Sequence, residues 1–229
     1  MPTIVFASPK GGAGKSTAAV LLATELANRG AAVAVIDADP NRPVSQWAKR
    51  PGKPESLTVV SEVTEKSIIG LIDEAASANA FVVVDLEGTA SVMVGYAISR
   101  ADLVIIPTQG SHLDAAESTK AINLVRSQEE AFGRTIPFAV LFTRTSAAIR
   151  PRTLQSVESE LAAKKIPIFK THLLEREAYR AIFSFGGSLS SLDPAEVSNV
   201  PAAILNAHAF VAEVLSMLKH HNSKSTRVA

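Results

Sequence analysis

The chain has 229 residues, a formal net charge of +1 and a hydrophobic share of 47%, with 20% of its residues charged. This composition supports the packed core of one α/β domain and excludes a disordered chain, and the near-neutral charge excludes a whole-molecule field that attracts nucleic acid. The absence of cysteine excludes disulfides, thiolate metal sites and iron–sulfur clusters.

Short apolar runs alternate with helical stretches along the chain. Continuous apolar strands indicate burial on both faces of a sheet. We therefore expect an α/β fold with a mostly parallel, twisted sheet and helices on both of its faces. Strands are predicted at residues 3–7, 32–36, 57–60, 81–84, 103–106, 138–142 and 168–169, and helices at residues 16–28, 67–78, 111–132, 153–163 and from Pro201 onward.

The C-terminal third of the sequence indicates where the domain is expected to end. Residues 185–200 are rich in Ser, Gly and Asn and predict a surface loop. The last helix carries apolar residues at helical spacing, which favours core packing over membrane binding. No secretory signal and no apolar run of the ~18 residues that a membrane span needs are expected. We predict a single domain over residues 1–221, a polar, disordered tail over residues 222–229, and a cytoplasmic location.

Residues 8–17, SPKGGAGKST, follow the first predicted strand and open the first predicted helix. A phosphate-binding loop requires this context, because glycines let backbone N–H groups turn onto phosphate oxygens and the helix N-terminus adds partial positive charge. Lys15 would reach the β- and γ-phosphates and Ser16 would ligate Mg²⁺. The predicted nucleotide-binding residues here are Lys10, Gly11, Gly12, Ala13, Gly14, Lys15, Ser16 and Thr17.

The loop also departs from the standard pattern G-x-x-x-x-G-K-S/T. Pro9 stands where the first glycine is expected, and Lys10 precedes the glycines. K-G-G-x-G-K-S/T after an N-terminal strand resembles the signature of the ParA/MinD family of P-loop ATPases, closest to its small ParF-like partition ATPases. The resemblance covers nearly the whole chain. It implies that Lys10 reaches across an ATP-sandwich homodimer and takes part in catalysis on the partner's phosphates.

Two further segments are similar to motifs of that family. Residues 37–41, DADPN, resemble the switch segment D-x-D-P-Q, which implies that Asp39 positions the attacking water. The strand ending at Asp85 resembles the Walker B strand, which implies a Mg²⁺ site formed by Ser16, Asp39 and Asp85. The chain continues D-L-E-G where the family often has D-x-P-P. Glu87 is either a second switch carboxylate or a solvated loop acid.

Two expectations concern basic side chains. Arg144 ends a strand where the family usually has an adenine-contacting asparagine, so Arg144 is predicted to stack on the base. Basic residues outnumber acidic ones across residues 134–180, and related ATPases bind DNA through this half. The alternative is a solvated mixed surface. The candidate DNA-binding residues are Arg150, Arg152, Lys164, Lys165 and Lys170, with contacts to phosphate rather than to bases.

The resemblance implies a ParA-type partition ATPase. Such a protein hydrolyses ATP with Mg²⁺, slowly until a partner stimulates it. It dimerises on ATP, binds nucleoid DNA non-specifically and segregates a plasmid or chromosome with a ParB- or ParG-like centromere-binding protein. The alternative is a MinD-like or cargo-positioning ATPase acting on a membrane or a protein cargo. The polar tail argues against a stable membrane anchor. A small-molecule ligase and a nucleotide-binding adaptor without turnover also remain open.

Overall fold

The computed structural model describes residues 1–88 and 91–225. The strands are β1 (Thr3–Phe6), β2 (Val33–Ala38), β3 (Leu57–Val60), β4 (Phe81–Leu86), β5 (Leu103–Thr108), β6 (Phe138–Thr145) and β7 (Leu173–Leu174). The helices are α1 (Lys15–Asn28), α2 (Pro43–Ala48), α3 (Ile68–Ala78), α4 (Val92–Ser99), α5 (His112–Phe132), α6 (Arg152–Ala163), α7 (Glu177–Phe185) and α8 (Val200–Ser225), with the 3₁₀ helix η1 (Leu189–Ser191).

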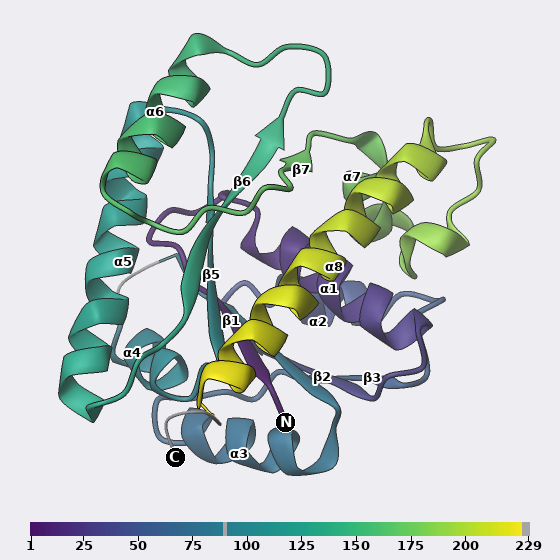
Figure 1. The fold of residues 1–229 in the computed structure, drawn as a ribbon. Coiled ribbons are helices and arrows are strands. Elements are labelled where there is room, and N and C mark those ends of the chain that lie inside the picture. The colour runs from purple at the N-terminus through teal and green to yellow at the C-terminus, as the bar shows by residue number, and fades with distance from the viewer. Residues whose placement is uncertain (89–90, 226–229) are drawn as a thin grey trace.

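One seven-stranded sheet runs through the molecule in the order β3-β2-β4-β1-β5-β6-β7 (Figure 1). Every described strand pair is parallel. Strand residues are almost entirely buried, and they are mostly β-branched or aliphatic, as expected for a sheet covered on both faces. The predicted α/β class with a parallel sheet is therefore confirmed.

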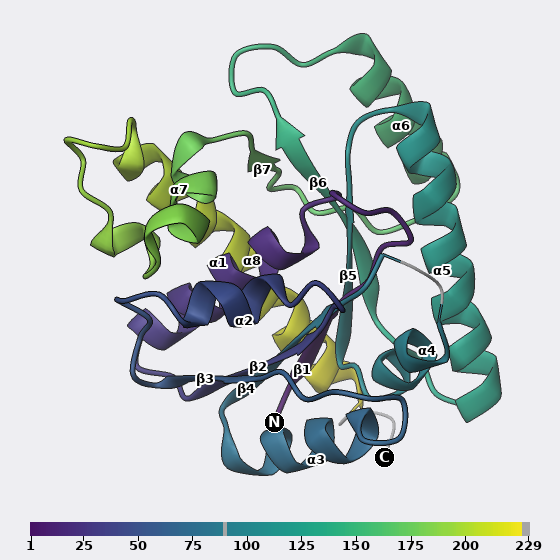
Figure 2. The ribbon, with the colours of Figure 1, turned by 180° about the vertical axis from the view of Figure 1, so that it is seen from behind.

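Helices form a layer on each side of this sheet (Figures 1 and 2). Alternate strand residues point to opposite faces, so Ile4 and Phe6 pack with α1, α2, α7 and α8, whereas Val5 packs with α3, α4, α5 and α6. The β1 strand is followed by α1 on one face, and the neighbouring β4 strand is followed by α4 on the other. The carboxyl ends of β1 and β4 therefore flank a crevice of the kind in which parallel sheets bind ligands.

The predicted strand at residues 168–169 is wrong. Ile168 makes only an isolated bridge to Val140, and the seventh strand is Leu173–Leu174, which pairs with β6. Phe169 is buried against Phe210 of α8, so its apolar character reflects packing rather than strand pairing. An apolar dipeptide does not distinguish these two causes.

Three short helices were not predicted, and the predicted surface loop is partly buried. The α2, α4 and α7 helices have 6, 8 and 9 residues, too short for a clear helical period. Pro43 at the first turn of α2 and Ser91 capping α4 were the available signals. Within residues 185–200, Leu189, Leu192 and Val197 are buried in the core.

Helix α8 is both a core helix and a long apolar segment. Its Val200–His221 part has a mean hydropathy of 1.4 and is long and apolar enough to cross a membrane by length and composition. The expectation that no stretch reaches this length is therefore wrong. Ala203, Phe210 and Val214 are buried in the same cluster as α1, which accounts for the apolar character of that side. The predicted tail begins inside this helix, and residues 226–229 lie outside the described part of the chain.

Candidate nucleotide-binding site

The glycine-rich loop joins the end of β1 to the first turn of α1. Gly12 and Gly14 adopt left-handed backbone conformations with φ of 76° and 90°. Gly14 precedes the first helical residue, Lys15, and a Cβ added to it would lie 3.4 Å from the Thr143 side chain. Glycine is thus favoured there by its backbone conformation, and the added Cβ would make only an ordinary contact. The free N–H groups of the first turn of α1 face the ligand side of the sheet.

Side chains from two neighbouring strands hold the carbonyl groups of this loop. The Thr143 hydroxyl donates to the Ala13 carbonyl at 2.8 Å and lies 3.2 Å from the Thr108 carbonyl. The Gln109 amide donates to the Gly12 carbonyl at 3.1 Å. These bonds tie the loop to the ends of β5 and β6, which fixes its orientation before any ligand arrives.

Lys15 is buried, with 5% of its surface exposed. Burial lowers the pKa of its ammonium group, while Asp85, Asp39 and Glu87 raise it by electrostatic attraction. Its Nζ lies 3.5 Å from the Lys10 carbonyl oxygen. A buried lysine among carboxylates at a helix N-terminus is suited to phosphate binding.

Two buried carboxylates lie side by side in the sheet beneath the loop. Asp37 of β2 and Asp85 of β4 are direct neighbours in the strand register. The Asp37 carboxylate accepts hydrogen bonds from the Ser45 amide at 2.7 Å and the Ser45 hydroxyl at 2.6 Å, which anchors the start of α2. Burial raises the pKa of Asp37 in spite of these bonds. Asp37 is therefore assigned a structural role in placing α2.

Asp85 is wholly buried, and neither of its oxygens has a hydrogen-bonding partner within the described ranges 1–88 and 91–225. Burial raises its pKa to about 7, an effect that the nearby Ser16 hydroxyl and the Lys15 ammonium oppose. An unpartnered buried carboxylate beside Ser16 fits a Mg²⁺ site. Across the part of the chain that the structure describes, no three acidic or histidine side chains form a metal cluster. Nucleotide oxygens and water would complete the coordination.

Asp39 lies on a tight turn between β2 and α2. Its Oδ1 accepts a hydrogen bond from the Asn41 amide at 2.8 Å, and its carbonyl accepts one from the Arg42 amide at 2.8 Å. Arg42 has a left-handed backbone with φ of 49° and precedes Pro43, the first residue of α2. The turn holds the Asp39 carboxylate beside the loop.

Most of the predicted residues meet in one open cavity of about 470 Å³. The predicted members are Gly11, Gly12, Gly14, Lys15, Ser16, Thr17, Asp39 and Arg144, and the additional members are Pro40, Asn41, Glu87 and Gly88. Asp85 lies directly behind this wall. Ala13 is buried in the loop, and Lys10 is exposed on its outer turn and does not line the cavity.

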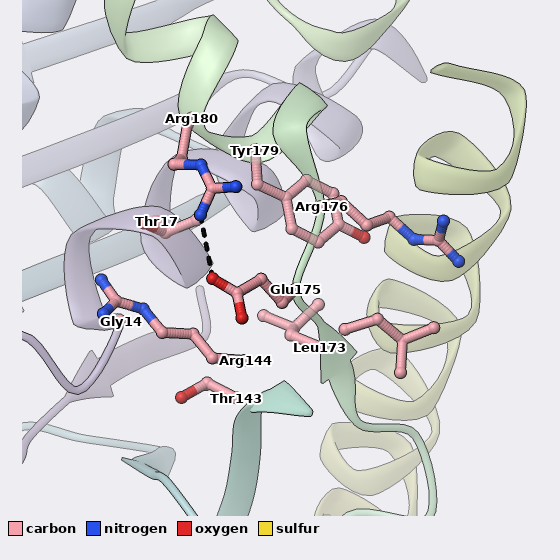
Figure 3. Close-up of a pocket in the computed structure, with 10 residues that line it drawn as sticks. Gly14, Thr17, Thr143, Arg144, Leu173, Glu175, Arg176, Tyr179 and Arg180 are labelled. Carbon is pink, nitrogen blue, oxygen red and sulfur yellow. Dashed lines mark hydrogen bonds and ion pairs between the residues drawn. The ribbon is translucent and has the colours of Figure 1, made fainter. Parts of the chain in front are cut away.

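A second cavity of about 60 Å³ adjoins the first through Gly14, Thr17 and Arg144 (Figure 3). Figure 3 shows the Arg144 side chain extending from the end of β6 toward Gly14. The far wall comes from β7 and α7 and includes Tyr179 and an ion pair between Arg180 and Glu175 at 2.9 Å. An apolar and aromatic wall beside a phosphate loop can hold a planar base. The sequence indicated Arg144 but gave no role to α7. This helix is far along the chain from the glycine-rich loop, so residue spacing does not predict that the two lie close together.

The candidate DNA-binding residues fall into two groups at opposite ends of α6. Arg150 and Arg152 lie at its N-terminal end, on the same edge of the sheet as the glycine-rich loop, whereas Lys164 and Lys165 follow its C-terminal end. Lys170 lies with Arg150 around an open hollow of about 500 Å³. Arg150 is paired with Glu158, and Lys164 is paired with Glu160 at 2.7 Å. The five candidate residues therefore do not lie together in one patch.

Gly88 packs directly on the glycine-rich loop, which accounts for the glycine at the end of the D-L-E-G sequence. A Cβ at Gly88 would lie 2.9 Å from the Gly11 amide nitrogen and 3.1 Å from the Lys10 carbonyl carbon. We expect Gly88→Ala to displace the loop and to weaken nucleotide binding by about tenfold or more.

Titration with a fluorescent nucleotide tests the effect of Gly88→Ala. The matched control is Gly70→Ala, because Gly70 lies inside α3 and its Cβ would meet nothing within 4 Å. The control should bind nucleotide like the parent and gain about 0.5–1 kcal/mol of stability. Parental affinity in Gly88→Ala would contradict the packing argument.

The fold and the site define a P-loop nucleotide-binding protein. The model of the VirC1 protein family matches residues 1–220. The chain is 45% identical over 218 residues to Protein ParA of Rhizobium radiobacter, covering 95% of this chain and 98% of that protein. It is 33% identical over 187 residues to Protein virC1 of Rhizobium rhizogenes, covering 80% of each. The chain therefore belongs to the ParA/MinD/VirC1 family of P-loop ATPases, as the sequence motifs predicted.

Solved structures share this fold at low identity. Apo McdA of Cyanothece matches with a TM-score of 0.73 and 19% identity, over 90% of this chain and 99% of that one. Cobyrinic acid a,c-diamide synthase of Mycobacterium smegmatis, solved with an ATP analogue and magnesium, matches with a TM-score of 0.63 and 16% identity, over 80% of this chain and 93% of that one. These likenesses concern the fold alone.

Proposed function

We propose that the protein is a ParA-type partition ATPase that uses ATP and Mg²⁺. The observation that carries the proposal is the meeting of the glycine-rich loop, Lys15 and Asp39 at one cavity, with the unpartnered Asp85 carboxylate behind it. The 45% identity to Protein ParA over nearly the whole chain supports the partition role. The adjoining cavity beside Arg144 and Tyr179 would receive the adenine base.

Different residues of the site would have different roles in ATP hydrolysis. Loop N–H groups and Lys15 would bind the phosphates and offset their charge, while Ser16 and Asp85 would hold Mg²⁺, which supplies charge neutralisation when bound. The Asp39 carboxylate, held by the Asn41 amide at 2.8 Å, would orient water for attack on the γ-phosphate. Turnover is proposed to be slow until a partner protein stimulates it.

The proposed cycle couples nucleotide state to DNA binding. ATP would join two chains into a sandwich dimer, with Lys10 of each chain serving the other chain's nucleotide. The dimer would bind nucleoid DNA in the cytoplasm through phosphate contacts, and a ParB- or ParG-like centromere-binding protein would trigger hydrolysis and release. The γ-phosphate would thus bias a two-state assembly.

Binding to random duplex DNA with ATP, ADP or no nucleotide tests this function, measured across a salt series. We expect ATP-dependent binding that weakens steeply with salt. The double variant Arg150→Ala/Arg152→Ala should lower affinity by about tenfold or more if the loop-side end of α6 faces DNA. The matched double variant Lys164→Ala/Lys165→Ala changes the other end of α6 and tells the two groups apart. Absence of DNA binding at low salt would contradict the partition role.

A further inference from the structure

Glu87 occupies a position that the proposed mechanism does not yet use. It follows the end of β4, two residues after Asp85, and side chains alternate along an extended chain. Leu86, between them, is buried in the core on the α3–α6 side of the sheet. Glu87 is half-buried and lines the cavity of about 470 Å³ together with Lys15 and Asp39. Glu87 therefore belongs to the wall of this cavity, and its charge acts on Lys15.

Backbone packing holds Glu87 in this place. The next residue, Gly88, lies so close to Gly11 that a Cβ would come within 2.9 Å of the Gly11 amide nitrogen. Gly88 thus packs against the phosphate-binding loop, directly next to Glu87 in the chain.

Several carboxylates lie close to Lys15 in this cavity. Lys15 is surrounded by three carboxylates, those of Asp85, Asp39 and Glu87, each of which acts on it electrostatically. Asp85 is wholly buried and lacks a hydrogen-bonding partner among the described residues. The terminal phosphates of a nucleotide would add further negative charge next to these groups, and a divalent cation would offset the resulting repulsion.

We propose that Glu87 is a further carboxylate of the Mg²⁺ side of the site, and that its charge makes nucleotide affinity depend on that cation. The proposal rests on the proposed function, since it assumes that a nucleoside triphosphate binds here. Glu87 would repel the triphosphate when no cation is present and would accept hydrogen bonds from Mg²⁺-bound water when the cation is present. The two effects act in opposite directions on affinity.

The measurement is the affinity for a fluorescent, non-hydrolysable ATP analogue, with Mg²⁺ and with EDTA. In Glu87→Gln we expect binding in EDTA to strengthen by about 3- to 10-fold and binding with Mg²⁺ to stay equal or to weaken. The ratio of the two dissociation constants should therefore shrink by about 3-fold or more. Glu87→Asp retains the charge and should keep the parental ratio. Glu65→Gln changes an exposed acid between β3 and α3 and should do the same.

The outcomes separate this proposal from the proposed function. A parental ratio in Glu87→Gln, in a protein that binds the analogue, would overturn the role of Glu87 alone. Failure of the unmodified protein to bind the analogue under either condition would overturn the proposed function and this proposal with it. The proposal for Glu87 would be supported if the ratio of the two dissociation constants shrinks in Glu87→Gln and stays parental in both control variants.

Discussion

Asp39→Ala is expected to lower ATP turnover by about 100-fold or more while ATP stays bound. The Asp39 carboxylate lines the cavity beside Lys15, and the Asn41 amide holds it at 2.8 Å. Positioned carboxylates that accept a proton or orient water contribute about 10²- to 10⁴-fold to rate. Because the alanine removes no residue of the glycine-rich loop, nucleotide affinity should stay within about threefold of the parent.

Phosphate release under multiple turnover measures the effect of Asp39→Ala, with and without DNA. ATP-dependent dimers should accumulate in the variant, because the step that dissolves them is blocked. Asp73→Ala is the matched control, since Asp73 is a surface acid paired with Arg100 at 3.3 Å. Parental turnover in Asp39→Ala would remove this residue from the mechanism.

Lys10→Ala is expected to abolish ATP-dependent dimerisation while leaving ATP binding by the single chain nearly unchanged. Lys10 is exposed on the outer turn of the loop and does not line the cavity of its own chain, whereas Lys15 is buried in that cavity. A second chain facing the same edge of the sheet would meet this exposed residue first. Loss of this charge should leave the phosphates at the dimer interface less well neutralised.

Light scattering tests the role of Lys10 by measuring molecular mass with ATP, under conditions in which the ATP is not hydrolysed. The parent should double its mass on adding ATP, and Lys10→Ala should remain a single chain at the same concentration. Lys66→Ala, an exposed lysine between β3 and α3, serves as the control for loss of one surface charge. Dimerisation of Lys10→Ala at parental ATP and protein concentrations would show that the residue acts elsewhere.

Much of the candidate site was predictable from local pattern. Each predicted polar residue at a strand end follows a continuous apolar run, and parallel strands bring their carboxyl ends to one edge. Asp85 lies near Lys15 and Ser16 of the glycine-rich loop, and Arg144 lies beside Gly14, whereas the place of Asp39 was inferred from the family resemblance. The helical period likewise located the long helices, because many residues contribute to each pattern.

Short elements and close backbone contacts were not predictable in this way. The α7 wall of the second cavity comes from residues far along the chain from the loop, and β7 contains only Leu173 and Leu174. The contact between Gly88 and Gly11 depends on two loops from neighbouring strands. The spacing of residues along the chain does not predict distances between such separate segments.

The amino-acid order alone was enough to establish a parallel α/β fold and a phosphate-binding loop with an additional lysine, because both follow from runs of neighbouring residues. Tertiary structure decided what surrounds that loop. It placed Glu87, whose role the sequence left undecided, in the cavity wall. It also placed Lys164 and Lys165 at the opposite end of α6 from Arg150 and Arg152. These are differences in three-dimensional placement, which arise only when distant segments pack together on the sheet.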